Sequence, residues 1–330
     1  MSFFFPVHRP RLGLSFTERG IALVELRRGW GKPGIARVRE RPLPNGVLRV
    51  SATEPNLLDR KAVEVELKSL LRCTSERTVA VCLPDHACHL AVFPFKTVPP
   101  RERERDSILR WRFEHEEHVL VGDARILHRV FSVREAAKTP VIQDDQITAY
   151  VLAMAMKRCV LDQYEQVCEQ MGVLPVSINC AAMWLFDFYR SVMTQAAELF
   201  FVHQAPDSMT FFAIRKGIPV FCRTKSWRHE KADVTGEIRC TMQFYEDLLS
   251  PGEAAIGPVS GPIYMVGAGY SEIEGFSDQI TSSQTRTAGK PASSWTPQLI
   301  FPDWKARVSE KNRTVFGEEW LYALACVGGR

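Results

Sequence analysis

The chain has 330 residues, of which 45% are hydrophobic and 24% are charged. This length exceeds what one hydrophobic core usually supports, so we expect two domains with the composition of an ordinary soluble protein. The formal net charge of +4 is too weak to indicate a nucleic-acid-binding protein, which needs a clustered basic stripe.

The cysteines and the apolar runs indicate a cytosolic protein. The nine cysteines are scattered and form no Cys-x-x-Cys pair, so we interpret them as reduced and mostly buried side chains. No run approaches the roughly 20 apolar residues of a membrane-spanning helix. The apolar start, Phe3 to Phe5, is short and is broken by Pro6, so we expect a leader that docks on its own domain and not a signal peptide.

The first half of the chain opens with a three-stranded meander and continues with alternating helices and strands. Turn residues and hydrophobic alternation predict its elements. The meander strands are expected at 11–16, 20–28 and 34–40, and they are followed by a helix at 56–72 and a strand at 77–83. Next come a strand at 87–96, a helix at 101–118, strands at 125–133 and 146–155, a helix at 157–171, a strand at 174–178 and a helix at 180–195.

The second half repeats this plan about 185 residues later, which predicts an internally duplicated α/β fold. Its meander is expected at 198–203, 208–214 and 218–224. A helix at 233–250, a strand at 263–266, a polar loop at 281–298 and a closing helix at 318–327 follow.

Several segments match, in the same order, the motifs of one family. The chain resembles the PilM family of type IV pilus assembly proteins, within the actin/FtsA superfamily. The matching segments are Leu12-Gly13-Leu14-Ser15-Phe16, Val79-Ala80-Val81-Cys82-Leu83-Pro84, Phe93-Pro94-Phe95-Lys96, Ile108-Leu109-Arg110-Trp111-Arg112-Phe113-Glu114, Glu237 to Tyr245, and Ile263 to Gly269.

The resemblance implies an actin-like duplicated α/β fold of the FtsA/PilM type, with an inserted α/β subdomain and a reduced second domain. We expect the first domain at residues 1–85 plus 175–196, the inserted subdomain at 86–174 and the second domain at 197–330. The outer subdomain of the second domain is expected to be missing, because only residues 226–233 join the second meander to the following helix.

The residues that contact the nucleotide in the family are largely replaced in this chain. The first phosphate loop normally reads Gly-apolar-Asp-apolar-Gly; here Gly13 is kept, Ser15 stands in place of the Asp and Thr17 in place of the second Gly. The second loop, at 202–207, has no Gly and contains a Pro, which donates no N–H. Gly267 and Gly269 keep the turn that contacts adenosine in the family, although a tight strand-to-helix turn explains them equally well.

These replacements predict a pseudo-ATPase: a protein that is not an enzyme and holds no metal or cofactor. Losing the contacts of both loops removes transition-state stabilisation worth about 2–4 kcal/mol each. The alternative is a PilM-like protein that still binds ATP and Mg²⁺ through altered loops. In that case Asp207 is the candidate metal carboxylate near the second loop.

The resemblance also implies a partner and a place in the cell. PilM proteins bind the cytoplasmic N-terminal tail of PilN, a bitopic inner-membrane protein, in a groove between the first domain and the inserted subdomain. We therefore expect a cytoplasmic scaffold of a type IV pilus or a related type II secretion-like assembly, attached to the inner-membrane platform through a PilN-like protein. Aromatic residues of the inserted subdomain are available to line or support the groove, or simply to form the core of that subdomain: Phe93, Phe95, Trp111 and Phe113.

Overall fold

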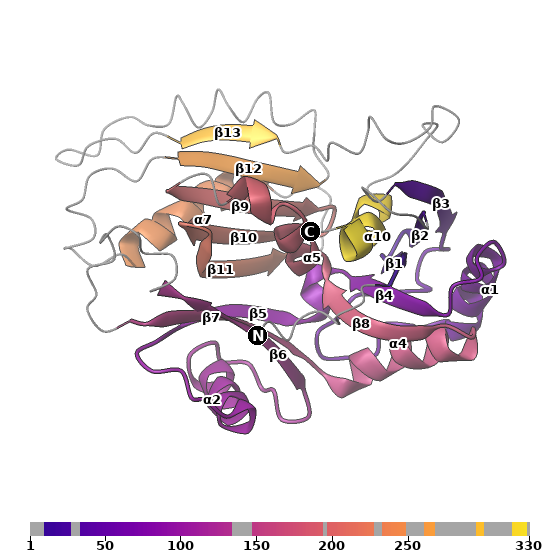
Figure 1. Ribbon diagram of the computed structural model, residues 1–330, viewed down its shortest axis with the longest axis horizontal. Coiled ribbons are helices and arrows are strands. Elements are labelled where there is room, and N and C mark those ends of the chain that lie inside the picture. The colour runs from indigo at the N-terminus through magenta and orange to yellow at the C-terminus, as the bar shows by residue number, and fades with distance from the viewer. Residues whose placement is uncertain are drawn as a thin grey trace.

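The computed structural model describes residues 10–27, 34–133, 147–193, 197–227, 233–248, 261–267, 295–299 and 319–328. Within these ranges the strands form two five-stranded sheets and one three-stranded sheet (Figure 1). None of the described helices is long and apolar enough to cross a membrane.

The first five-stranded sheet combines an antiparallel meander with two parallel strands. Its order is β3-β2-β1-β4-β8, and all five residues of β1 are buried. Helix α1 begins after Asp59, whose side chain accepts the N–H of Ala62 as an N-cap. The elements are β1 (Leu12–Phe16), β2 (Gly20–Leu26), β3 (Ile35–Pro42), α1 (Arg60–Leu71), β4 (Thr78–Leu83) and β8 (Leu174–Cys180).

The second five-stranded sheet repeats this topology strand for strand. Its order is β11-β10-β9-β12-β13, with an antiparallel meander followed by two parallel strands. The elements are β9 (Glu198–Ala205), β10 (Ser208–Arg215), β11 (Ile218–Ser226), α7 (Val234–Leu248), β12 (Gly261–Gly267) and β13 (Trp295–Leu299). The predicted duplication is therefore confirmed, and the two meanders lie in different sheets.

Two sequence expectations change in this half. The polar stretch at 281–298 was expected to be a loop, but its last residues belong to β13, because β12 supplies a parallel partner for them from Gly261 to Met265. The rest of that stretch lies outside the described residues. The second meander also extends further than expected: β9 continues through Ala205 and pairs with β10 up to Ser208.

The three-stranded sheet is inserted between β4 and β8 of the first sheet. It is antiparallel in the order β5-β7-β6, and helix α2 covers one of its faces (Figure 1). Its other face joins the large core, through side chains such as Leu152 and Met154. The elements are β5 (His89–Phe95), α2 (Glu102–His115), β6 (Arg125–Ser132) and β7 (Ala149–Met156), and α4 (Arg158–Gln170) leads back to β8.

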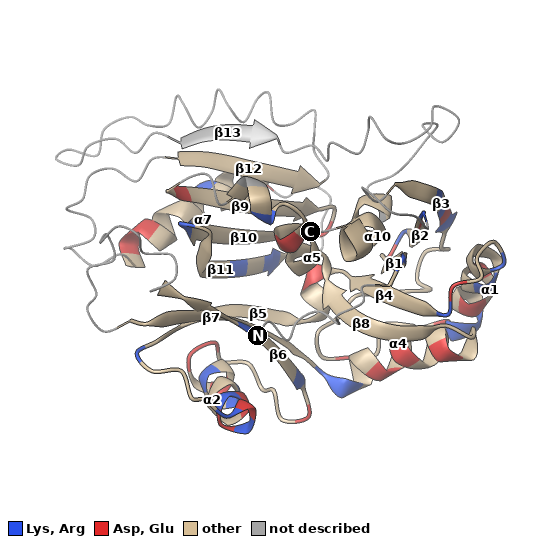
Figure 2. Ribbon diagram, in the orientation of Figure 1, with Lys and Arg blue, Asp and Glu red and all other residues tan. Residues whose placement is uncertain are grey.

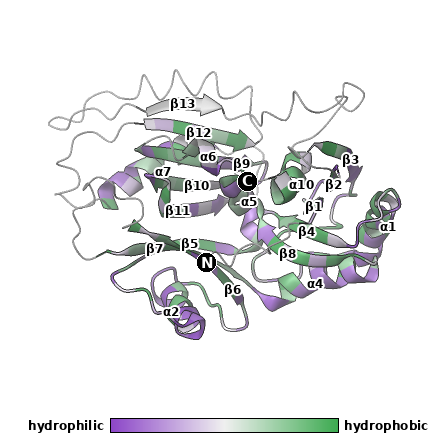
Figure 3. Cartoon of the chain, viewed as in Figure 1, coloured by the Kyte–Doolittle hydropathy of each residue, from purple (hydrophilic) through white to green (hydrophobic). Residues whose placement is uncertain are grey.

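Apolar helices lie between the two large sheets. They are α5 (Ala181–Phe188), the short α6 (Arg190–Met193) and α10 (Glu319–Gly328), and Figure 3 shows that α5 and α10 are largely hydrophobic. Helix α10 packs on β1, β2, β4 and α5. The contact with β1 requires a glycine, because a Cβ at Gly13 would lie 2.0 Å from the carbonyl oxygen of Ala323. The fold is thus a duplicated α/β fold with an inserted subdomain; the domain boundaries themselves stay a prediction.

Candidate functional site

The tip of the first hairpin, between β1 and β2, uses its own backbone groups. The N–H of Thr17 donates to the carbonyl of Gly20 at 2.9 Å, and the N–H of Gly20 donates back to the carbonyl of Thr17 at 3.3 Å. The Thr17 hydroxyl lies 3.1 Å from the same Gly20 nitrogen. The Glu18 carboxylate accepts the N–H of Val50 at 2.7 Å. The N–H groups of Thr17 and Gly20 are therefore already satisfied inside the turn.

The tip of the second hairpin, between β9 and β10, is a tight turn formed by Pro206 and Asp207. The ladder pairs Ala205 with Ser208, so only two residues connect the strands. Both turn carbonyls are occupied, because that of Asp207 accepts the backbone N–H of Trp227 and that of Pro206 accepts its indole N–H, at 2.9 and 3.0 Å. This turn is not an open cradle of N–H groups of the kind that binds phosphate.

The predicted nucleotide residues occupy places that packing explains. Gly13 faces helix α10, and Ser15 is fully buried within the first sheet. Gly267 has a φ of 117°, and a Cβ there would lie 1.8 Å from the carbonyl oxygen of Gln204 on the neighbouring strand. A glycine is needed at this position for close strand approach, whether or not a ligand is present. Gly269 lies outside the described residues.

A buried polar network joins the two halves at the centre of the molecule. Asp85, at the start of the 3₁₀ turn η1 (Asp85–Ala87) after β4, is fully buried. One of its oxygens accepts the N–H of Ala182, the second residue of α5, at 2.7 Å. The other accepts Nδ1–H of His203 from β9 at 2.6 Å and the hydroxyl of Thr210 from β10 at 2.7 Å. Nε2 of His203 lies 3.2 Å from the Tyr322 hydroxyl of α10.

These partners keep Asp85 ionised in a dry environment. Burial alone would raise the pKa of this carboxyl, but the charge and hydrogen bond of His203, with the hydrogen bonds from Ala182 and Thr210, hold the pKa below its ordinary value. His203 is itself 1% exposed. An Asp–His pair can activate a nucleophile in a hydrolase. Here the imidazole instead faces a buried tyrosine with no access for a substrate, so the pair joins the two halves.

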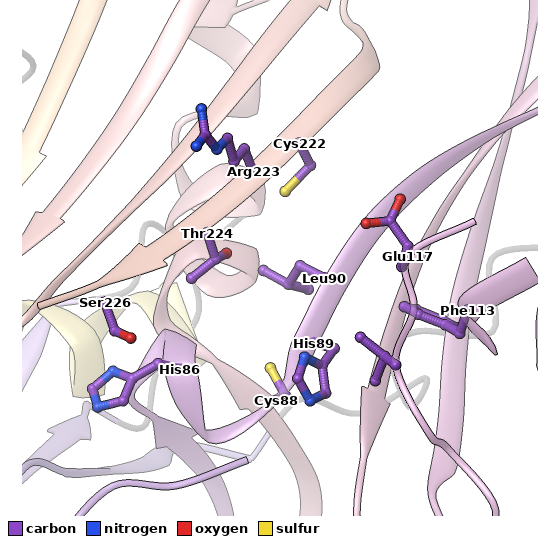
Figure 4. A pocket seen from close by; sticks show the side chains of 11 residues that line it. His86, Cys88, His89, Leu90, Phe113, Glu117, Cys222, Arg223, Thr224 and Ser226 are labelled. Atoms are coloured by element: carbon purple, nitrogen blue, oxygen red, sulfur yellow. The ribbon is translucent and has the colours of Figure 1, made fainter. Parts of the chain in front are cut away.

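A small cavity lies beside this network, between the inserted subdomain and β11. It has a volume of about 240 Å³, and its lining combines residues of β5, of the segment after α2 and of β11 (Figure 4). Burial and the charge of Lys157 lower the pKa of His89, and burial together with the charge of Glu116 raises the pKa of Glu117. The cavity does not present a cluster of like charges for a phosphate.

The aromatic residues predicted for partner binding lie mostly inside the inserted subdomain. Phe93, Phe95 and Phe113 are at most 8% exposed and form the core between the three-stranded sheet and α2. Phe93 and Phe113 meet edge to face at 5.2 Å. Phe93 and Phe95 can support a binding surface from within this core, and Phe113 also lines the cavity between the inserted subdomain and β11. Trp111 is 55% exposed and stacks on His115, on a helix that carries interspersed acidic and basic side chains (Figure 2).

The strand order leaves exposed apolar side chains at two sheet edges. Among the described strands, β8 is the last strand of the first sheet and β6 the last of the three-stranded sheet. Leu174 and Val176 on β8 and Val130 on β6 are exposed. The sequence analysis did not select these residues, because alternation in a strand does not reveal which strand lies at an edge.

The two sheets of matching topology, with an inserted subdomain in the first, define a class of fold: the chain has the actin-like ATPase fold. No protein-family model matches the chain, and no curated protein matches its sequence. A solved structure described as the PilM-PilN type IV pilus biogenesis complex is similar to it, with a TM-score of 0.67, 16% identity and 98% of each chain covered. A Bacteroides thetaiotaomicron protein with an actin-like ATPase fold and unknown function is also similar, with a TM-score of 0.51, 8% identity, and 90% of this chain and 94% of that chain covered. The fold is thus of the PilM type.

The residues of the buried polar network could not be recognised as a group in the sequence. Asp85 was assigned to the turn that ends strand 77–83, and His203 to the last position of strand 198–203, where the second loop begins; β9 continues two residues beyond His203. The available signal was a histidine directly after the apolar run Leu199-Phe200-Phe201-Val202. A buried polar side chain in such a strand needs a partner, but the sequence does not say which one.

Proposed function

We propose that this protein is a non-catalytic scaffold of a type IV pilus or a related secretion-type assembly. It binds the cytoplasmic N-terminal tail of a PilN-like inner-membrane protein, and through that partner it is held at the cytoplasmic face of the inner membrane. The observation that carries the proposal is the hydrogen-bonded network of Asp85, His203 and Thr210, which joins the two halves through buried side chains.

The two hairpin tips support the absence of ATP hydrolysis. The first turn pairs the N–H groups of Thr17 and Gly20 with its own carbonyls, and the second turn contains Pro206, which donates no N–H. Because catalysis of phosphoryl transfer is almost entirely positioning and electrostatic stabilisation, a site with these tips lacks what the reaction needs.

The similarity to PilM in a PilM-PilN complex supports the choice of partner. Among the described residues no further strand pairs with the outer edges of β6 and β8, and both strands carry exposed apolar side chains, as an extended peptide needs. A tail that adds to such an edge gains backbone hydrogen bonds, and its alternate side chains gain apolar contact. Val130, Leu174 and Val176 are the apolar side chains that such a tail would cover.

Binding of a synthetic PilN-like tail from the same genome, followed by fluorescence anisotropy, tests this proposal. An extended apolar peptide gains roughly 25 cal/mol per Å² buried and loses part of this on ordering, so micromolar affinity is expected. The variants Val130→Glu and Val176→Glu should each weaken binding by at least tenfold. Val65→Glu, at an exposed valine of α1, is the matched control and should bind as the wild type does.

The response to salt separates apolar docking from ionic docking. Exposed charge pairs are screened at raised ionic strength, whereas apolar contacts are not. We expect the affinity to change less than threefold between about 50 mM and about 500 mM NaCl, two concentrations between which the screening of exposed charges increases strongly. Undiminished binding by both edge variants, or the same loss in the Val65→Glu control, would refute the edge-strand assignment.

A further inference from the structure

Three side chains with metal-ligating atoms meet where the two hairpin tips approach each other. Glu18 lies in the β1–β2 turn, His86 in η1 and Asp207 in the β9–β10 turn. One ligand atom of each residue lies within 4.8 Å of those of the other two. The three groups come from both halves of the fold, and each is partly buried.

The spacing fits a shared cation better than a direct ion pair. Nε2 of His86 lies 3.7 Å from Oδ2 of Asp207, which is beyond hydrogen-bond length. Two ligand atoms bonded to one ion at about 2.1 Å are about 3.0–3.6 Å apart when the angle between the bonds is 90–120°. The pair is therefore already close to the separation that an ion between the two atoms would impose.

The state of His86 is a second and independent observation. Its side chain is 16% exposed, and its Nδ1 atom is buried with no hydrogen-bond partner among the described residues. Nε2 is the ring atom that faces Asp207, so an ion there would leave Nδ1 on the other side of the ring as the nitrogen that donates to a water, as metal-bound imidazoles do. The carboxylates of Glu18 and Asp207 also repel each other at this distance unless a positive charge lies between them.

We propose that Glu18, His86 and Asp207 bind a divalent transition-metal ion in the absence of nucleotide, and that this ion links the two halves. One imidazole and two carboxylates are donors that suit Mn²⁺, Fe²⁺ or Zn²⁺ better than the all-oxygen sets preferred by Mg²⁺ and Ca²⁺. Water completes the coordination. The proposal goes beyond the scaffold function and does not depend on it, because it concerns the hairpin tips and not the sheet edges.

Mn²⁺ is the suitable probe, because nine free cysteines would bind softer ions adventitiously. The full chain, stripped with a chelator, is titrated with Mn²⁺ alone while the free ion is followed by electron paramagnetic resonance. We expect one ion per chain and an increased unfolding temperature. Asp207→Asn and Glu18→Gln keep an oxygen for the hydrogen bonds from Ser208 and Val50, so they should fold normally and raise the Mn²⁺ Kd at least tenfold.

Two further variants complete the test. His86→Gln should weaken Mn²⁺ binding to a similar extent, whereas Glu104→Gln, at an exposed carboxylate of α2, should leave it unchanged. Absence of stoichiometric binding at millimolar Mn²⁺ would overturn the proposal. An unchanged Kd in Asp207→Asn and Glu18→Gln would also overturn it, as would binding that occurs only when ATP is added, since that would be a metal–nucleotide site.

Discussion

Replacing Asp85 by alanine removes the acceptor that joins the two halves of the fold. Three donors lose their partner: the N–H of Ala182, Nδ1–H of His203 and the hydroxyl of Thr210. The Thr210 hydroxyl can turn to Thr224, whose oxygen is 3.0 Å away, so two donors stay unsatisfied. Each costs about 1–3 kcal/mol, and removing one partner of a buried ion pair costs about 3–5 kcal/mol. We therefore expect Asp85→Ala to lose about 3–5 kcal/mol of unfolding free energy.

Urea unfolding followed by circular dichroism measures this loss, and thermal unfolding should show a decrease of roughly 6–20 °C. Asp85→Asn keeps an oxygen for the Ala182 N–H and should lose less, about 1–2 kcal/mol. The exposed variant Glu104→Ala is the control and should change stability by less than about 0.5 kcal/mol. If Asp85→Ala were no more destabilising than Glu104→Ala, the network would not hold the halves together.

Three further predictions follow from the same structure. The pKa of Asp85 is lowered in the folded protein, so the contribution of its ionised carboxylate to stability is complete above the unfolded pKa of about 3.9 and is lost as the pH falls through the lower folded value. The stability difference between wild type and Asp85→Asn should therefore be constant from about pH 5 to 7 and shrink below about pH 4. A difference that stays constant at lower pH would contradict the lowered pKa of Asp85. Gly13→Ala and Gly267→Ala should lower stability by about 1–3 kcal/mol or more through clashes with backbone carbonyls, whereas Gly122→Ala, with open space around it, should stay near the wild type in the same urea titration. Burial raises the pKa of the Cys82 and Cys180 thiols and raises that of Cys168 to about 12, so a thiol reagent at pH 8 should modify the exposed Cys240 first and these three only on unfolding; rapid modification of any of the three would refute their burial.

The sequence was sufficient to predict the architecture because local patterns of apolar residues and turns indicate its strands and helices. The two meanders are made of short, largely apolar runs between clear turns, and the repeat of the whole plan predicted the duplication. The phosphate-loop replacements at Ser15 and Thr17 were also visible, because they concern single positions in a short hairpin. Strand limits were less predictable, since β13 exists only through its pairing with β12.

The buried polar network between the halves could not be predicted in the same way. Asp85 and His203 are 118 residues apart, and only the folded chain brings them together. The aromatic residues of the inserted subdomain show a related limit. Trp111 and Phe113 lie two residues apart in the same charged segment, yet Phe113 is in the core and Trp111 is exposed, because the side of α2 that faces the sheet is set by the packing of the whole subdomain.

Calorimetric titration with Mg-ATP tests most directly the central claim that the altered hairpin tips do not bind a nucleotide. The wild-type chain should show no saturable heat with ATP up to the millimolar range and no change in unfolding temperature, although a ligand at 100 times its Kd would stabilise it by about 2.7 kcal/mol. One ATP bound per chain with micromolar affinity would contradict this claim, since the hairpin tips would then still form a nucleotide site.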